Sequence, residues 1–209
     1  MTPSARPWVE WAQRAAALAQ NGLTYNQNPF DRERYESLRR IAAEMLAHVG
    51  DAPLEKIEGL LADQVGYATP KVDVRGAVFD QDRVLLVREA MDGRWSLPGG
   101  WADPGDTPRE AVEREIREES GYLARAVRLA AVVDRARQGN EPPLPFAVYK
   151  IFFLCSLEGG EPRGSKETLD VGFFPVDALP PLSLGRVTPA QIERLYVHQG
   201  NPDLPTDFD

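Results

Sequence analysis

The sequence predicts an α/β domain preceded by a small all-α domain. Residues 7–65 carry apolar side chains at the three- and four-residue spacing of helices, and no strand pattern occurs before Pro70. After Pro70, short apolar runs typical of strands are interspersed with two helical segments, as in a layered α/β domain. We therefore expect a helical domain over residues 1–66 and a larger domain over residues 67–209.

Three helices are expected in the first domain. Gly22 should end the first, Asp31 should cap the second, and Pro53 should open the third. The first helix has an apolar face formed by Trp8, Trp11, Ala15 and Leu18. The other two carry Tyr35, Leu38, Ala42, Met45, Val49, Ile57, Leu60 and Leu61. Because three short helices bury little surface alone, we expect a second copy of the chain to cover the Trp8 face, giving a homodimer.

The second domain should begin with a pair of strands, residues 72–79 and 84–88, joined by the turn at 80–82. A helix follows, and further strands are expected around residues 126–133, 146–157 and 172–175, with a closing helix at 188–197. The polar loop 135–145 contains three prolines. It could shape substrate entry or be a plain solvated connection.

Composition excludes several classes of protein. A formal net charge of −8 argues against an electrostatic grip on long nucleic acid but is compatible with a small nucleotide substrate. No apolar run approaches the length of a membrane span and the start lacks a secretory signal, so we expect a cytoplasmic protein. The single cysteine, Cys155, lies in an apolar run and should be a buried structural thiol. Both histidines, His48 and His198, fall near helix ends, where capping or surface roles are expected.

Residues 97–122 are the most informative part of the chain. They end with Glu115, Glu118 and Glu119, whose spacings of three and four place them on one stripe of a helix. Carboxylates crowded in this way repel one another unless a cation neutralises them, and Mg²⁺ prefers such oxygen ligands. Thr107 and Pro108 should start this helix and Ser120-Gly121 should end it, while Val112 and Ile116 anchor it to a core. An isolated motif of this kind is usually a solvated surface.

The whole stretch, however, resembles the Nudix box, G-x5-E-x7-R-E-U-x-E-E-x-G-U with U apolar. It matches at Gly100, Arg114, Glu115, Ile116, Glu118, Glu119 and Gly121, and Tyr122 occupies the last apolar position. Asp106 stands where the pattern has its first Glu, which is peripheral to the metal in the family. This departure concerns local support of the helix more than catalysis.

The helical front end is similar to the N-terminal domain of a bacterial Nudix subgroup that hydrolyses X-linked nucleoside diphosphates. That subgroup includes CDP-choline and ADP-ribose pyrophosphatases. The similar positions are Trp8, Gly22, Leu23, Tyr25, Asn28, Pro29, Asp31, Arg34 and Tyr35. This pattern is looser than the box.

The resemblance to Nudix hydrolases implies an α/β/α sandwich around a mixed sheet, with Mg²⁺ or Mn²⁺ dependence. It implies that Glu115, Glu118 and Glu119 hold the metal and that Arg114 orients a box carboxylate. Glu118 is the ligand expected also to contact the attacking water. Glu167, on a Gly-rich segment after the box, lies near the position where several relatives carry a catalytic Glu, although it could equally be an exposed loop acid.

Phosphate and base contacts are less specific. Arg75, Arg88 and Arg94 precede the box on strands or loops that should face the cleft, and guanidinium groups suit bidentate phosphate binding. Each alone could instead form a surface ion pair. Trp95 and Trp101 could stack on a base or be packed in the interior.

The sequence thus predicts a metal-dependent hydrolase of nucleoside diphosphates linked to a group X, with CDP-choline first and ADP-ribose second as substrates. Action on RNA ends is an alternative that the acidic balance disfavours. A non-catalytic Nudix regulator that uses the front helices to bind DNA is a third. The intact box argues against lost catalysis. Residues 1–66 contain seven Lys/Arg against nine Asp/Glu, which disfavours a DNA-binding domain.

Overall fold

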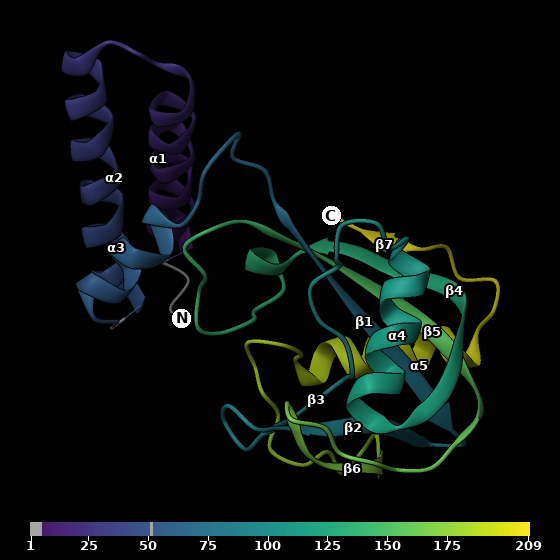
Figure 1. Ribbon diagram of the computed structural model, residues 1–209. Helices are drawn as coiled ribbons and strands as arrows, with labels where there is room; N and C mark the ends of the chain where they lie inside the picture. The colour runs from purple at the N-terminus through teal and green to yellow at the C-terminus, as the bar shows by residue number, and fades with distance from the viewer. Residues whose placement is uncertain (1–5, 51) are drawn as a thin grey trace. The chain divides into compact units, whose positions relative to one another are not determined.

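The computed structural model describes residues 6–50 and 52–209. The chain divides into two compact units, one comprising Met1–Lys71 with Glu141–Ala147 and the other Val72–Asn140 with Val148–Asp209 (Figure 1). The first is helical and the second contains the sheet, so the expected α/β fold with a helical front end is confirmed.

The helical unit contains three helices, α1 (Arg6–Tyr25), α2 (Pro29–Gly50) and α3 (Leu54–Ala62). The buried side of α1 is formed by small residues that pack with α2 and α3, namely Val9, Ala12, Ala16 and Ala19. Trp8 and Trp11 lie on another side of α1, where each residue remains about half exposed (51% and 50%). Of the face predicted from the sequence, Ala15 packs against the core of this unit, whereas Trp8, Trp11 and Leu18 remain exposed.

Two predicted helix boundaries are wrong. Gly22 lies inside α1, where a Cβ atom would approach the Tyr35 ring to 2.4 Å, so this glycine permits close packing of α1 and α2. Asp31 lies within the first turn of α2 and pairs with Arg34. The side chain of Asn28 accepts the N–H of Phe30 at 2.9 Å and takes the capping role instead.

The proline-rich loop is divided between the two units. Its first part forms a short 3₁₀ helix, η1 (Arg135–Arg137), in the sheet unit, whereas residues 141–147 belong to the helical unit. There the Gln13 side chain donates to the carbonyl of Leu144 at 2.8 Å. The second part of the loop is thus packed against α1, and the expectation of a plain solvated connection is wrong for it.

The sheet unit contains seven strands in the order β3-β2-β1-β5-β4-β7, with β6 paired to β2. Their bounds are β1 (Lys71–Asp80), β2 (Arg83–Glu89), β3 (Trp95–Ser96), β4 (Tyr122–Asp134), β5 (Val148–Gly160), β6 (Thr168–Pro175) and β7 (Asp207–Phe208). The β2–β6 and β4–β5 pairs are antiparallel, and β7 joins β4 in parallel, so the sheet is mixed as expected. The five predicted strand segments are confirmed, and two short strands, β3 and β7, are additional.

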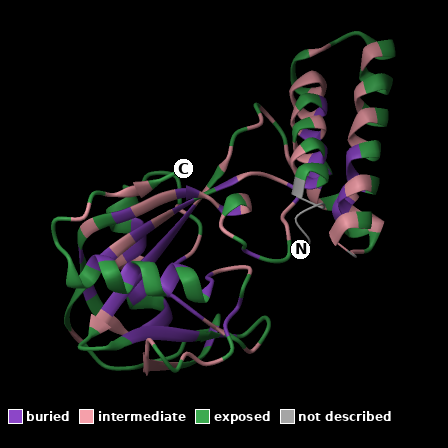
Figure 2. Ribbon diagram, turned by 180° about the vertical axis from the view of Figure 1, so that it is seen from behind, coloured by how far each residue is buried: buried purple, intermediate pink, exposed green. Residues whose placement is uncertain are grey.

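Helices α4 (Pro108–Ser120) and α5 (Pro189–Gly200) contribute to two separate apolar clusters. Val112 and Ile116 of α4 are fully buried with Val74 of β1, as predicted, whereas Ile192 of α5 is buried with Ala77 of the same strand. Successive residues of a strand point to opposite faces. The two helices therefore cover opposite faces of the sheet, and the buried residues gather between the layers (Figure 2).

Two isolated expectations have different outcomes. Cys155 is buried, as predicted, and burial raises the pKa of its thiol to about 12, which suits a structural role. His198 lies near the end of α5 as expected, but a surface role is wrong because only 1% of the residue is exposed and its Nε2 pairs with Asp207 at 2.9 Å.

Candidate active site

The box helix α4 is fixed at both ends by local interactions. The Thr107 hydroxyl accepts the backbone N–H of Glu110, and the Glu110 carboxylate accepts that of Thr107, which is a complete capping box. At the other end Gly121 adopts a left-handed conformation with φ 76°. Helix α4 therefore begins at Pro108 and ends at Ser120, as the sequence predicts.

The glycine loop before α4 runs beside β1. Val74 N–H donates to the Gly100 carbonyl at 2.8 Å, and Ala102 N–H donates to the Val72 carbonyl at 3.0 Å. Gly99 has φ +141°, and a Cβ atom there would lie 2.1 Å from the Val74 carbonyl oxygen, so only glycine is accommodated. This close approach brings the Gly99 amide to the box helix.

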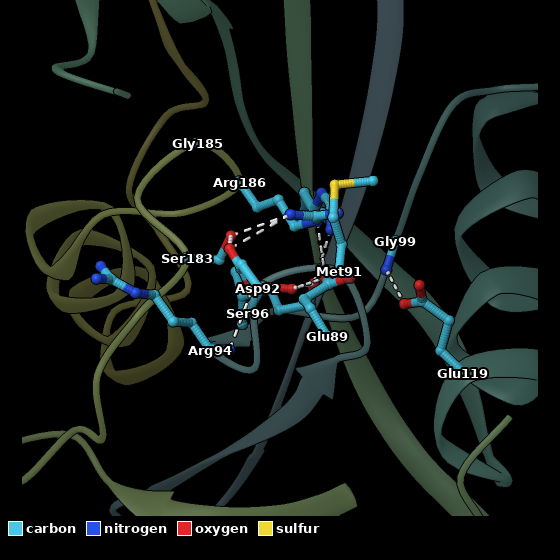
Figure 3. Close-up of polar contacts among 12 residues, drawn as sticks. Glu89, Met91, Asp92, Arg94, Ser96, Gly99, Glu119, Ser183, Gly185 and Arg186 are labelled. Atoms are coloured by element: carbon cyan, nitrogen blue, oxygen red, sulfur yellow. Dashed lines mark hydrogen bonds and ion pairs between the residues drawn. The ribbon is translucent and has the colours of Figure 1, made fainter. Parts of the chain in front are cut away.

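Glu119 is the buried carboxylate at the centre of the site. One of its oxygens accepts the Gly99 N–H at 2.8 Å (Figure 3). Its backbone carbonyl accepts the hydroxyl of Thr168 at 2.7 Å. Burial raises the pKa of Glu119 to about 7, opposed by the charge of Arg75 and the Gly99 bond, while the charges of Glu89 and Glu115 raise it further. Several carboxylates thus lie within electrostatic reach of one another.

Glu115 lies one turn earlier and faces the glycine loop. A Cβ atom on Gly100 would meet a Glu115 carboxylate oxygen at 3.2 Å, so the absence of a side chain at Gly100 leaves room for this group. Burial also raises the pKa of Glu115, against the opposing charge of Arg114, whose Nη1 donates to it at 2.7 Å.

Arg114 joins the acidic groups around the helix. Besides Glu115 it contacts Asp106 at 3.0 Å and Glu118 at 3.3 Å. The contact with Asp106 matches the expectation that this shorter acid supports the box helix. Glu118 remains half exposed, at 52% of its side chain, and lies within 3.7 Å of Arg117 as well.

A divalent cation suits this arrangement chemically. Within the residues that the structure describes, no three acidic, histidine or cysteine side chains are gathered closely enough to enclose an ion. Glu115 and Glu119 are nevertheless two carboxylates from successive turns, both with a pKa raised by burial, beside glycines that leave space in front of them. Carboxylate oxygens that are partly removed from water and that repel one another are stabilised by a bound cation.

Glu167 lies near the site through its backbone. Its carbonyl accepts the N–H of Ala90, and the next residue, Thr168, bonds to the carbonyl of Glu119. The Glu167 side chain itself is exposed. The segment is therefore held next to the C-terminal end of α4.

The three candidate substrate arginines have different surroundings. Arg75 is buried and its guanidinium donates to the Asp73 carboxylate and to the Leu97 carbonyl, both at 3.0 Å. Burial lowers the pKa of this guanidinium, but neighbouring acids including Glu119 together outweigh that effect, so the pKa is raised above its ordinary value. Arg88 is exposed and its Nε donates to the Gly93 carbonyl. Arg94 is exposed and extends away from Glu119 (Figure 3). Of the three, only Arg75 is brought to the box carboxylates.

The two tryptophans near the glycine loop, Trp95 and Trp101, differ in burial. Trp95 is half-buried and packs edge-on against Phe174 with ring centroids 4.5 Å apart, the interior packing that was one of the two expectations. Trp101 is 49% exposed beside the glycine loop.

Sequence reasoning missed a buried acid–arginine pair next to the site. The carboxylate of Glu89, at the end of β2, accepts the Ser96 hydroxyl at 2.6 Å and pairs with Arg186 Nε at 2.9 Å (Figure 3). Arg186 precedes α5, 97 positions along the chain from Glu89. No local spacing could have signalled this contact, although an acid ending an apolar strand is an unusual residue that deserved notice.

The comparisons with known proteins agree with this geometry. Residues 6–61 match the family model described as a UDP-X-like N-terminal oligomerisation domain, and residues 69–195 match that of the NUDIX domain. None of the described helices has an apolar stretch of the length needed to span a bilayer.

Three relatives are similar over most of their own length. The Bacillus subtilis protein YjhB, provisionally assigned as an ADP-ribose pyrophosphatase, is 47% identical over 97% of both chains. A crystal structure of a UDP-X diphosphatase is 37% identical, covers 98% of both chains and has a TM-score of 0.61. An ADP-ribose pyrophosphatase from Streptococcus suis is 40% identical over 68% of this chain and all of its own, with a TM-score of 0.62.

The box residues, the mixed sheet between two helical layers and these matches lead to one assignment. The chain belongs to the Nudix hydrolases and is a pyrophosphohydrolase with an N-terminal oligomerisation domain.

Proposed function

We propose that this enzyme hydrolyses the diphosphate bond of a nucleoside diphosphate linked to a second group X, releasing a nucleoside monophosphate and the phosphate ester of X. The observation that carries this proposal is the pair of carboxylates formed by the buried Glu119 and the partly buried Glu115, held against the Gly99–Gly100 loop in a chain of this family. A diphosphate resists attack because its oxygens are anionic, so a site that acts on it has to neutralise that charge and orient one water molecule.

The residues have distinct tasks in this reaction. Glu115, Glu118 and Glu119 would hold Mg²⁺ or Mn²⁺, which supplies positive charge to the phosphate oxygens and acidifies water. Arg114 orients Glu115 and Glu118 through its bonds to both. Glu118 or Glu167 takes the proton as the water oxygen bonds to phosphorus and the bridging P–O bond breaks. Both side chains reach solvent, as an acceptor that must pass the proton on requires.

The substrates to test first are ADP-ribose and UDP-linked compounds. Relatives that align over almost the whole chain or over their own full length bear these names. CDP-choline, which the sequence alone ranks first, belongs to the same chemical class and follows them. Long RNA is the least favoured substrate, because the protein's net charge of −8 repels a polyanion.

The oligomer is proposed to be a homodimer formed through the helical unit. The match to an oligomerisation domain supports this, as do Trp8 and Trp11, which lie 5.1 Å apart on an exposed face of α1. Two neighbouring indoles on a surface are typical of residues that become buried at an interface.

A panel assay tests the proposed function. The protein is mixed with ADP-ribose, UDP-glucose or CDP-choline and with Mg²⁺ or Mn²⁺, and phosphate is measured after phosphatase treatment, which acts on the monoester products and not on these substrates. For a 5′-triphosphorylated RNA, the phosphate and pyrophosphate released by the protein alone are measured instead. We expect turnover of at least one X-linked nucleoside diphosphate and none without the metal. Turnover of the RNA alone, or of no compound, would contradict the proposal.

A further inference from the structure

Arg186 is the cation closest to the buried Glu89, and part of its guanidinium remains uncommitted. Nε forms an ion pair with the Glu89 carboxylate at 2.9 Å. Nη1 donates to the Ser183 hydroxyl at 3.1 Å and lies 3.8 Å from the Asp92 carboxylate. Nη2 has a different neighbour, the thioether sulfur of Met91 at 3.9 Å. A thioether is a weak acceptor, so the outer edge of this guanidinium has unused donor capacity.

The position of Arg186 links it to the candidate active site. Its partner Glu89 lies near enough to Glu119 for its charge to raise the pKa of that carboxyl, and Arg75 interacts with both acids. A charged network therefore runs from the loop before α5 to the box helix. Figure 3 shows Glu89 between Arg186 and the Gly99–Glu119 bond.

The immediate surroundings hold Arg186 in one orientation. Ser183 hydroxyl donates to Asp92 at 2.7 Å and thereby ties the loop before α5 to the turn after β2. Only 25% of the Arg186 side chain is exposed, whereas Met91, which contacts Nη2, is 84% exposed. An anionic ligand could displace this methionine at little cost, because an exposed side chain has few contacts to lose.

We propose that Arg186 binds a phosphate group of the substrate and of the product, with its Nη2 edge donating to non-bridging oxygens after Met91 has moved aside. Glu89 orients the guanidinium as the ion-pair partner of Nε, and Ser183 orients it by accepting a hydrogen bond from Nη1. The chemistry of the recognised group is that of a phosphate monoester or diphosphate oxygen, for which guanidinium is a matched partner. The inference rests on the proposed function for the identity of the ligand, not for the existence of the anion site.

The test compares four variants with the wild-type enzyme. Arg186→Gln removes the charge, and Arg186→Lys keeps a charge beside Glu89 but loses the forked donors. Met91→Ala removes the displaceable side chain. Arg83→Gln is the matched control, because Arg83, on β2, also pairs with an acid, Asp80 at the end of β1, but is exposed. Thermal unfolding establishes that each variant is folded, and the Lys variant keeps the test valid if the Gln variant is not.

The measured quantities are the calorimetric dissociation constants of AMP and ribose 5-phosphate and the KM for ADP-ribose. At least one dissociation constant should rise about 10- to 100-fold in both Arg186 variants, because a charge-assisted bond to phosphate is lost. Met91→Ala and Arg83→Gln should change it less than about 3-fold. Wild-type affinity in Arg186→Lys would mean that Arg186 only neutralises Glu89 and would overturn the proposal, as would unchanged constants in both variants.

The two hypotheses fail separately. If the wild-type enzyme hydrolyses an X-linked nucleoside diphosphate but neither its KM nor product binding depends on Arg186, the anion site is wrong and the function stands. If no compound of the panel is hydrolysed while AMP or ribose 5-phosphate binding depends on Arg186, the anion site stands and the function is wrong.

Discussion

The box helix α4 and the first helix α1 both have a clear helical pattern in the sequence, yet the apolar face of α4 is covered within the chain and part of the apolar face of α1 is not. In α4 the apolar residues Val112 and Ile116 are fully buried under β1 and the box acids Glu115 and Glu119 line the site, so the pattern is satisfied within one chain. In α1 the pair Trp8 and Trp11 stays half exposed, and small residues fill the interior. Apolar spacing shows that a face needs cover but does not say what provides it.

The difference separates catalysis from assembly. Changes in α4 should affect chemistry in each protomer, whereas changes on the exposed face of α1 should affect association and leave the proposed metal-binding residues intact. The predictions below follow this division, beginning with the largest expected effect.

The largest effect is expected at the buried carboxylate. Glu119→Gln keeps the size of the side chain but removes a charge from the proposed metal site, and turnover should fall about 10³-fold, because several kcal/mol of charge stabilisation are lost. The variant Glu193→Gln, an exposed acid on α5, is the control and should be unaffected. Near-normal turnover of Glu119→Gln at saturating Mg²⁺ would remove Glu119 from the site.

A second comparison distinguishes the two candidate bases. If Glu167 accepts the proton, Glu167→Gln should lower turnover about 10²-fold or more with metal affinity retained, because a base acts on water and not on the ion. Glu118→Gln should instead lower both, since Glu118 is also a proposed ligand. Turnover and Mn²⁺ titrations on both variants provide the test, and full activity of Glu167→Gln would make it an ordinary loop acid.

The face of α1 should control association. Replacing both Trp8 and Trp11 by Ser should weaken self-association about 10²-fold or more, as expected for two indoles at an interface, with little change in helix content. Light scattering over a concentration series measures this. Val127→Ser, on an exposed position of β4, is the control. A wild-type protein that is monomeric, or a variant that remains dimeric, would show that this face is not the interface.

The link between α5 and β7 gives a smaller effect on stability and a defined pH dependence. Hydrogen bonds from Arg194, and also from His198, lower the pKa of Asp207 to about 2. Because the folded pKa lies below its ordinary value of about 4, this contribution is present above pH 4 and is lost as the pH falls toward 2. Asp207→Asn should lower the free energy of unfolding by about 1 kcal/mol at pH 7 and flatten the acid side of the stability profile. Chemical denaturation at several pH values measures both, and parallel profiles for the two proteins would contradict the assignment.

The smallest effect is expected at Asp106, the one departure from the box pattern. Its carboxylate supports Arg114 at 3.0 Å and is remote from Glu119 in the chain. Asp106→Glu should change stability by less than about 1 kcal/mol and turnover only slightly. Denaturation and initial rates measure these quantities, and complete inactivation would give Asp106 a direct role in catalysis.

Local signals explain what the sequence could predict. The capping box at Thr107, the left-handed Gly121 and the alternation of strands each depend on a few neighbouring residues. They gave the limits of α4 and the layered fold without any knowledge of contacts. Gly22 was misread because a glycine needed for close packing and one that ends a helix look the same in a sequence.

Long-range pairing explains what could not be predicted. The bonds of Arg186 to Glu89 and of His198 to Asp207 join segments whose approach depends on the packing of α5 and the strands. The strand β7 has only two residues and no pattern of its own. Among the candidate substrate arginines, position before the box did not distinguish the buried Arg75 from the outward-reaching Arg94.

The central claim is that this enzyme breaks a bond inside a diphosphate. The most direct measurement is mass analysis of the products formed from ADP-ribose, or from the best substrate of the panel, in ¹⁸O-labelled water with Mg²⁺. The account predicts a nucleoside monophosphate and the phosphate ester of X, with one ¹⁸O atom on one of the two phosphates. Products in which the nucleoside diphosphate remains whole, or the absence of any labelled phosphate, would contradict it.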